Sequence, residues 1–261
     1  MCAPNGARKT KADHPALPLS TGELADCAES ILRAGASIMH VHVRDEDGRH
    51  SLDVDRYRAA TDAIRDRVSN QLVIQITTEA CGTYEPEQQM AMVRDLQPEA
   101  VSLALKELCP DEASELAAKE FFLWLSVEGV MAQYILYSPQ EVVRFARLRG
   151  KGVISDNRPF VLFVLGRYSD DLTGDPNELE EFVAALDDDT EWAVCCFGQT
   201  EQTAASMASA MGGHARVGFE NNLLVPDGGT ATDNAALVKL AAVCQGDRRL
   251  ATASDVRNML A

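Results

Sequence analysis

Two histidines separated by one residue are the part of the sequence best suited to chemistry. His40 and His42 lie in SIMHVHVRD (37–45), which alternates apolar and polar residues as an extended strand does. Side chains at i and i+2 of a strand point the same way, about 6–7 Å apart along the backbone, which is close enough to share a metal ion. Imidazole suits Zn²⁺, and a catalytic zinc keeps three protein ligands and one open position. The same pair could instead be hydrogen-bonded histidines of a half-buried strand.

The other three histidines are scattered singly along the chain, at His14, His50 and His214. His40 and His42 are therefore the only histidine cluster that the sequence itself shows. A metal site would need a third ligand from elsewhere in the chain.

Length and composition narrow the class of protein. The chain has 261 residues, and its 46% hydrophobic and 25% charged content is ordinary for a globular protein. A net charge of −16 argues against nucleic-acid binding, and an anionic substrate would need a local basic pocket. The seven cysteines form no CxxC pair, which is typical of a reducing compartment. We expect a cytoplasmic protein, because no membrane-length apolar run and no signal segment is visible.

Predicted strands and helices alternate along the chain. Alternating or apolar segments predict strands, and amphipathic segments with capping signals predict helices. The predicted strands are 37–45, 71–78, 100–105, 132–137, 159–165, 191–197 and 214–220. The predicted helices are 21–34, 53–68, 86–96, 111–130, one that starts at Ser138, 177–186, 200–211, 232–243 and 254–260.

Residues 1–8 could be the stub of a first strand, which would give eight strand-then-helix units. Such alternation predicts a parallel sheet with crossover helices. Eight units in this length favour a closed (β/α)8 barrel, an α/β fold that forms one domain over residues 1–261. Without the stub only seven units remain, and the barrel is less secure.

The active site of such a barrel lies at the C-terminal ends of its strands. The candidate site residues are therefore the polar residues near each strand's exit. They are Asn5, Arg8, His40, His42, Arg44, Thr77, Thr78, Glu79, Ser102, Gly166, Arg167, Arg216, Glu220, Asn221 and Asn222. Glu220 is the candidate third metal ligand, because it offers a carboxylate at a strand end. Singly, each residue has an ordinary interpretation, such as a solvated loop acid for Glu220, but together they favour a site.

Several segments resemble the β-keto acid cleavage enzymes. They are MHVHVRDEDG, IQITT, GGHARVGFENN and the opening APNGARKTKADHPALPLS, and the resemblance covers essentially the whole chain. It implies a zinc-dependent (β/α)8 barrel that forms an oligomer, a homo-tetramer or dimer. It also implies a reaction between a β-keto acid and acetyl-CoA that yields acetoacetate and a new acyl-CoA. Other first-row metals compete for two histidines and a glutamate, so the ion itself stays open.

The resemblance also implies roles for single residues. His40, His42 and Glu220 would bind the metal, whose open positions would hold the keto and carboxylate oxygens of the substrate. Arg216 would belong to the acid–base machinery. Thr77 would hydrogen-bond the substrate or the transferring acyl group, where the family often has serine. The expected substrate-binding residues are Arg8, Arg44, Thr78 and Ser102, the last at a common threonine position.

Three positions depart from the family pattern. Asn221 stands where the family often has an aspartate that takes part in proton abstraction, and an amide cannot be a general base. Glu79 stands where the family often has glycine, so we hypothesise that Glu79 is the base. Arg8 stands where members acting on amino-substituted substrates have an acid, which favours an anionic or neutral substrate tail.

Two other interpretations stay open. The difference at Asn221 could mean another metal-dependent C–C lyase or hydrolase on the same barrel. The barrel could also have lost catalysis and only bind a carboxylate, although retention of three ligands argues against this. The sequence shows no glycine-rich phosphate loop, so the expectation of acetyl-CoA rests on the resemblance alone.

Overall fold

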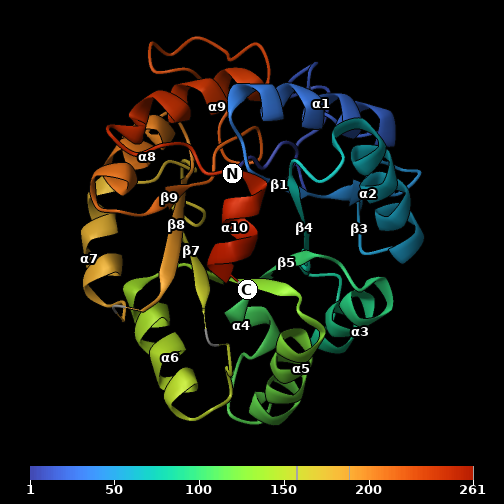
Figure 1. Ribbon diagram of the computed structural model, residues 1–261, viewed down its shortest axis with the longest axis vertical. Helices are drawn as coiled ribbons and strands as arrows, with labels where there is room; N and C mark the ends of the chain where they lie inside the picture. Colours follow the sequence, from blue (N-terminus) through green and yellow to red (C-terminus); the bar gives the residue numbers. More distant parts are fainter. Residues whose placement is uncertain (157, 188, 261) are drawn as a thin grey trace.

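The computed structural model describes residues 1–156, 158–187 and 189–260, and a curled parallel sheet forms its centre. Seven strands follow one another in the order β1-β4-β5-β6-β7-β8-β9, with helices arranged around them (Figure 1). They are β1 (Ile38–Val41), β4 (Val73–Thr77), β5 (Ala100–Ala104), β6 (Met131–Leu136), β7 (Phe160–Leu165), β8 (Glu191–Cys196) and β9 (His214–Ala215). Every pairing in this sheet is parallel, as the alternation of strands and helices predicted.

Residues 1–3 join the first strand of the sheet to the last. Cys2 forms parallel bridges with Met39 on β1 and with Val217 just after β9. The Cys2 N–H donates to a β1 carbonyl at 2.9 Å, and the Ala3 N–H donates to the Val217 carbonyl at 2.8 Å. The predicted stub therefore takes the place of an eighth strand, and the expected barrel is confirmed.

The helices alternate with the strands. They are α1 (Thr21–Ala34), α2 (Val54–Val68), α3 (Pro86–Leu96), α4 (Leu105–Leu108), α5 (Glu115–Glu128), α6 (Pro139–Gly150), α7 (Leu179–Ala184), α8 (Glu201–Ala210), α9 (Asn234–Ala242) and α10 (Ala253–Leu260), with 3-10 turns η1 (Pro176–Glu178) and η2 (Val243–Gln245). Helices α1 and α6 begin at the predicted caps, Ser20 and Ser138. In α1 the Ser20 hydroxyl accepts from the Glu23 N–H, and Gly35 ends the helix in a left-handed conformation. No helix in the described part of the chain is long and apolar enough to cross a membrane.

The interior of the barrel changes from apolar to polar along its strands. Ile38 on β1 lies beside Val73 on β4, and two residues further on His40 lies beside Gln75. At the apolar end α10 contributes side chains to the same buried cluster and covers the barrel (Figure 1). The polar side chains are therefore gathered at the C-terminal ends of the strands.

The segment 37–45 was predicted to be one continuous strand. In the structure it breaks at His42. β1 ends before this residue, and β2 (Val43–Arg44) turns away to pair with β3 (His50–Ser51) in antiparallel fashion. The Asn5 amide donates to the His42 carbonyl at 2.9 Å, and its oxygen accepts from the His42 N–H at 3.3 Å. These two bonds replace those of a neighbouring strand and account for the break.

The helix predicted over 111–130 begins later, at Glu115. The Asp111 carboxylate and the Ser114 hydroxyl each accept a hydrogen bond from the other residue's N–H. Side-chain bonds of this kind compete with a first helical turn. The short helix α4, which follows β5 directly, was not predicted.

The strand predicted over 214–220 is also shorter, because β9 ends at Ala215. Gly218 has a φ of +133°, and its N–H donates to the Glu201 carboxylate at 3.1 Å. A Cβ at Gly218 would lie 2.5 Å from the Ala3 carbonyl oxygen. The bend therefore requires glycine at the point where the chain passes the closing residues 1–3.

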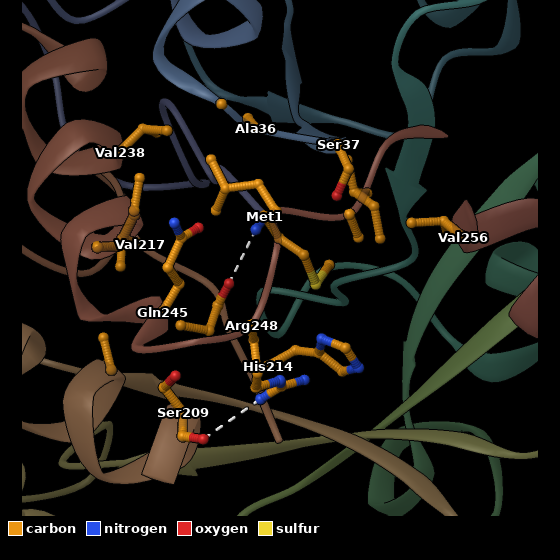
Figure 2. A pocket seen from close by; sticks show the side chains of 18 of the residues that line it. Met1, Ala36, Ser37, Ser209, His214, Val217, Val238, Gln245, Arg248 and Val256 are labelled. Carbon is orange, nitrogen blue, oxygen red and sulfur yellow. Dashed lines mark hydrogen bonds between the residues drawn. The ribbon is translucent and has the colours of Figure 1, made fainter. Parts of the chain in front are cut away.

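One pocket lies at the N-terminal end of the barrel, between α10 and the starts of β1 and β9 (Figure 2). Two of its polar groups bond to backbone: the Met1 amine donates to the Ala215 carbonyl at 2.8 Å, and Arg248 donates to the Gly213 carbonyl at 2.7 Å. This end of such a barrel serves stability rather than catalysis.

We expect Gly218→Ala to lower the melting temperature more than Gly228→Ala does. Both glycines have positive φ, but a Cβ at Gly228 meets nothing within 4 Å. Backbone strain of this kind costs roughly 1–3 kcal/mol, and only Gly218→Ala adds a clash with the Ala3 carbonyl. Thermal unfolding followed by circular dichroism measures both shifts, and equal shifts would contradict the expectation.

Candidate active site

A pocket of about 300 Å³ lies at the C-terminal ends of the strands, where the sequence predicted the site. The candidate residues that line it are Asn5, Arg8, His40, His42, Thr77, Glu79, Ser102, Arg167, Arg216 and Glu220. They come from the N-terminal loop and from the exits of β1, β4, β5, β7 and β9. The structure thus brings most of the predicted rim into one cavity, while the roles of these residues toward a ligand stay predictions.

Five of the candidate residues do not line this pocket: Arg44, Thr78, Gly166, Asn221 and Asn222. The Thr78 hydroxyl donates to the Ser102 carbonyl at 3.3 Å. The Arg44 guanidinium donates to the Gly6 carbonyl and holds the N-terminal loop. Asn221 is buried beside the cavity without lining it. The contacts that the structure gives Thr78 and Arg44 are therefore structural.

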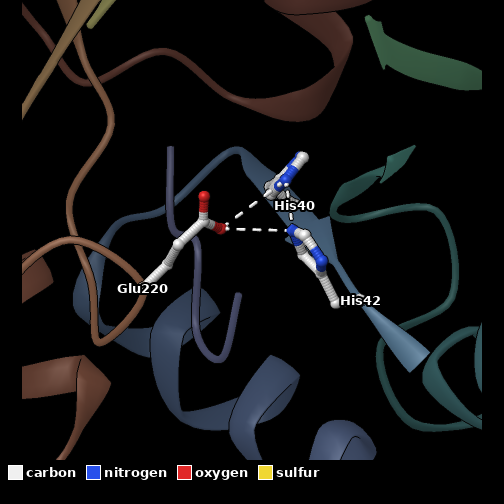
Figure 3. Close-up of side chains that lie close together, drawn as sticks. All are labelled: His40, His42 and Glu220. Atoms are coloured by element: carbon white, nitrogen blue, oxygen red, sulfur yellow. Dashed lines mark hydrogen bonds and ion pairs between the residues drawn. The ribbon is translucent and has the colours of Figure 1, made fainter. Parts of the chain in front are cut away.

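His40, His42 and Glu220 form a compact cluster at the base of the pocket (Figure 3). The Glu220 Oε2 atom lies 3.6 Å from His40 Nε2 and 3.4 Å from His42 Nε2. The two Nε2 atoms are 3.1 Å apart. One ligand atom from each residue is thus aimed at a common point, as metal coordination requires.

Burial sets the protonation of these ligands. It lowers the pKa of His40 to about 4 and that of His42 to about 3, so both imidazoles are neutral at pH 7. Burial acts to raise the pKa of Glu220, but the Arg216 guanidinium and the imidazoles hold it well below its usual range. Two neutral imidazoles and one carboxylate are the states in which these side chains bind metal.

Two glutamines inside the barrel orient the His40 ring. His40 Nδ1 lies 2.9 Å from Gln75 Oε1, and the Gln75 amide donates to Gln133 Oε1 at 3.2 Å. Because the Gln75 oxygen faces the ring, Nδ1 carries the proton and Nε2 keeps its lone pair. The sequence argument missed both glutamines, although an amide in the apolar segments VIQIT and MAQYIL was a signal for them.

The backbone and Arg216 position the carboxylate ligand. Arg216 Nη2 donates to Glu220 Oε1 at 3.0 Å, and Lys9 Nζ donates to the Glu220 carbonyl at 2.7 Å. A Cβ at Gly6 would lie 2.5 Å from Glu220 Cγ, so only glycine fits there. Glu220 Oε2 has no hydrogen-bond partner among the described residues. A divalent cation between it and the imidazoles would satisfy this atom, so the donor set fits a metal.

A second carboxylate lies on the other side of His42. Glu79 Oε1 is 3.4 Å from Arg8 Nη2 and 3.9 Å from Arg167 Nη2, and Oε2 is 4.0 Å from His42 Nδ1. Burial, followed by the nearby Glu220, raises the pKa of Glu79. The sequence suggested that His50 is isolated from the other histidines. In the structure its ring centre is 5.2 Å from that of His42. The pairing of β2 with β3 brings it there.

Apolar side chains form part of the pocket wall. They are Ala104, Ile135, Val164, Leu172 and Phe197. Such a wall beside a few directed polar groups is typical of small-molecule sites. The cavity can therefore hold a molecule with a polar head and a longer tail.

A comparison with family models gives a match over residues 1–261 to the model described as beta-keto acid cleavage enzyme. Curated relatives agree with this match. A 3-keto-5-aminohexanoate cleavage enzyme of Fusobacterium nucleatum is 30% identical over 98% of this chain and 94% of its own length. A 3-oxoadipate:acetyl-CoA acetyltransferase of Cupriavidus necator is 26% identical over 98% and 91%.

Solved structures show the same fold. A ternary complex of ObcA with a C4-CoA adduct and oxalate has a TM-score of 0.72 at 17% identity, over 94% of this chain and 67% of that chain. A 3-dehydroquinate dehydratase from Enterococcus faecalis has a TM-score of 0.56 at 10% identity, over 95% and 93%.

We expect the purified protein to carry about one divalent ion per chain, and His42→Ala to carry less than about a tenth of that. The variant removes one of the three ligands and leaves the other two too few to hold the ion. Metal content measured by mass spectrometry tests this. His214→Ala, which alters a histidine at the opposite end of the barrel, is the control and should keep its metal.

Proposed function

The chain belongs to the beta-keto acid cleavage enzyme family, and from this premise we propose that it transfers the acyl group of a β-keto acid to CoA by a metal-dependent reaction with acetyl-CoA. The observation that carries the proposal is the buried cluster of His40, His42 and Glu220 in the pocket. The products are acetoacetate and a new acyl-CoA. A relative named for acetyl-CoA transfer, the Cupriavidus necator enzyme, supports the co-substrate.

In the proposed acyl exchange, the bonds broken and formed balance. The C2–C3 bond of the β-keto acid breaks, and its acyl group forms a thioester with the CoA sulfur. The two-carbon acid that remains forms a C–C bond with the acetyl group that CoA gave up, which makes acetoacetate. A metal bound at the cluster would polarise the keto group and stabilise negative charge on its oxygen.

Two hydroxyls are the proposed substrate-binding groups. Ser102 Oγ lines the pocket and has no hydrogen-bond partner among the described residues. Thr77 Oγ1 accepts the Glu79 N–H at 3.0 Å, which leaves its own proton free to donate. We assign both hydroxyls to the oxygens of the substrate or of the transferring acyl group.

Glu79 is the proposed general base. Asn221 cannot accept a proton as a base, and it does not line the pocket. Glu79 lines the pocket, and its raised pKa brings it closer to the range in which a carboxylate exchanges protons at neutral pH. Arg216, buried against Glu220, is proposed to keep the charge of that ligand fixed during the reaction.

The substrate tail is proposed to be anionic or neutral. Arg8 and Arg167 bring two positive charges to the pocket, and the apolar wall favours a carbon chain. Three finer points are also proposals: zinc as the ion, a homo-tetramer or dimer as the assembly, and the cytoplasm as the location.

The first test follows acetoacetate formation from a panel of β-keto acids, with and without acetyl-CoA. We expect acetoacetate only when both substrates are present, loss of activity after chelation, and recovery with Zn²⁺. Turnover without acetyl-CoA would instead identify another C–C lyase or hydrolase, the alternative that Asn221 raises. A preference for amino-substituted tails would contradict the proposed role of Arg8.

The second test is Glu79→Gln, which keeps the size of the side chain but cannot take a proton. We expect kcat to fall by about 10²–10⁴-fold, the usual loss for a general base. Steady-state kinetics on metal-loaded protein measure this, with Asp13→Asn, another pocket acid, as the control. A Glu79→Gln enzyme with full activity would rule out Glu79 as the base.

A further inference from the structure

The two histidine ligands differ in how the rest of the protein holds them. His40 Nδ1 is paired with Gln75 at 2.9 Å. His42 is equally buried, yet its Nδ1 has no hydrogen-bond partner among the described residues. Asn5 fixes the backbone of His42, and the His42 ring has hydrogen-bond contacts only on its Nε2 side among the described residues.

Metal binding would make this difference matter. A neutral imidazole that gives the Nε2 lone pair to a metal carries its proton on Nδ1. Metal-binding histidines almost always donate this N–H to a carboxylate, a carbonyl or water. His42 therefore needs an acceptor on its Nδ1 side once the site is loaded.

We propose that Glu79 is this acceptor, and that it positions His42 for the metal. Glu79 Oε2 is 4.0 Å from His42 Nδ1, and rotation of the side chain that moves it by about 1 Å would give an ordinary hydrogen bond. Its other oxygen, Oε1, lies near Arg8 and Arg167 and would stay near them while Oε2 turns toward His42.

The surroundings of Glu79 favour such a movement. Its backbone is fixed, because the Glu79 N–H donates to Thr77 Oγ1 at 3.0 Å and its carbonyl lies 2.8 Å from His50 Nε2. Its side chain is 25% exposed, and its ion pairs with Arg8 and Arg167 are long. The carboxylate can therefore turn toward His42 without moving the strand end.

His50 is the competing acceptor. Its Nδ1 also has no partner among the described residues, and its ring centre is 5.2 Å from that of His42. Glu79 is favoured because a carboxylate accepts a stronger hydrogen bond than a neutral imidazole does. The inference rests on the metal site of the proposed function but not on the reaction that this site performs.

The test is the zinc affinity of the full-length protein, measured by competition with a chromophoric chelator. Glu79→Ala should weaken binding by about 10–100-fold, as loss of such a partner usually does. Glu79→Gln should weaken zinc binding less than Glu79→Ala does, because the glutamine amide oxygen can still accept the His42 N–H. Asp13→Asn removes a charge from the same pocket at a residue that does not contact His42. Its zinc affinity should stay within about threefold of the wild-type value. Glu79→Met serves in place of the alanine variant if the latter does not fold.

A spectroscopic measurement distinguishes loss of the His42 hydrogen bond from a general disturbance of the metal site. In Co²⁺-loaded protein, proton NMR resolves the exchangeable Nδ1–H of each ligand imidazole. Glu79→Ala should speed solvent exchange of the His42 proton and leave the His40 proton, held by Gln75, unchanged. Equal changes at both protons would overturn the proposal. So would wild-type zinc affinity in Glu79→Ala, or a full affinity loss seen only in His50→Phe.

These outcomes are separate from those of the reaction. Weakened zinc binding in Glu79→Ala, together with a wild-type protein that makes no acetoacetate, would leave the inference standing and remove the proposed function. Acetoacetate formation by the wild type, with unchanged zinc affinity in Glu79→Ala, would support the proposed function and overturn the inference.

Discussion

The hydrogen bonds of residues 2–5 set the distance between the two halves of the candidate metal site. The Cys2 carbonyl accepts from the His40 N–H at 2.8 Å, and the Ala3 carbonyl accepts from the Glu220 N–H at 3.0 Å. Asn5 holds the backbone of His42 on both sides. His40 lies on the first strand of the sheet and His42 just after it, and Glu220 follows the last strand, so this one segment places all three candidate ligands.

The charge of the site differs from that of the whole molecule. The chain carries a net charge of −16, whereas four basic residues of the pocket, Arg8, Lys9, Arg167 and Arg216, are matched by four acids, Asp13, Glu79, Glu107 and Glu220. The pocket is therefore close to neutral in a strongly negative protein, and its basic groups offset the repulsion that the surrounding acids would exert on an anion.

The sequence predicted what depends on local pattern, and missed what depends on distant contacts. Capping residues placed α1 correctly, and the strand exits were enough to single out His40, His42 and Glu220, which the fold brings together. The break at His42 depends on a side chain 37 residues away, which no local periodicity reveals. The same holds for His50, whose place beside the site depends on the pairing of β2 with β3.

The positions of the three candidate ligands in the sequence also limit when during synthesis the site can form. About 180 residues separate His42 from Glu220, and a ribosome adding 5–20 residues per second needs roughly 10–35 s to make them. During that interval the nascent chain has both imidazoles but not their carboxylate partner, and residues 1–3 have no last strand to join. A metal that needs all three residues could therefore bind only after β9 is made and the barrel has closed.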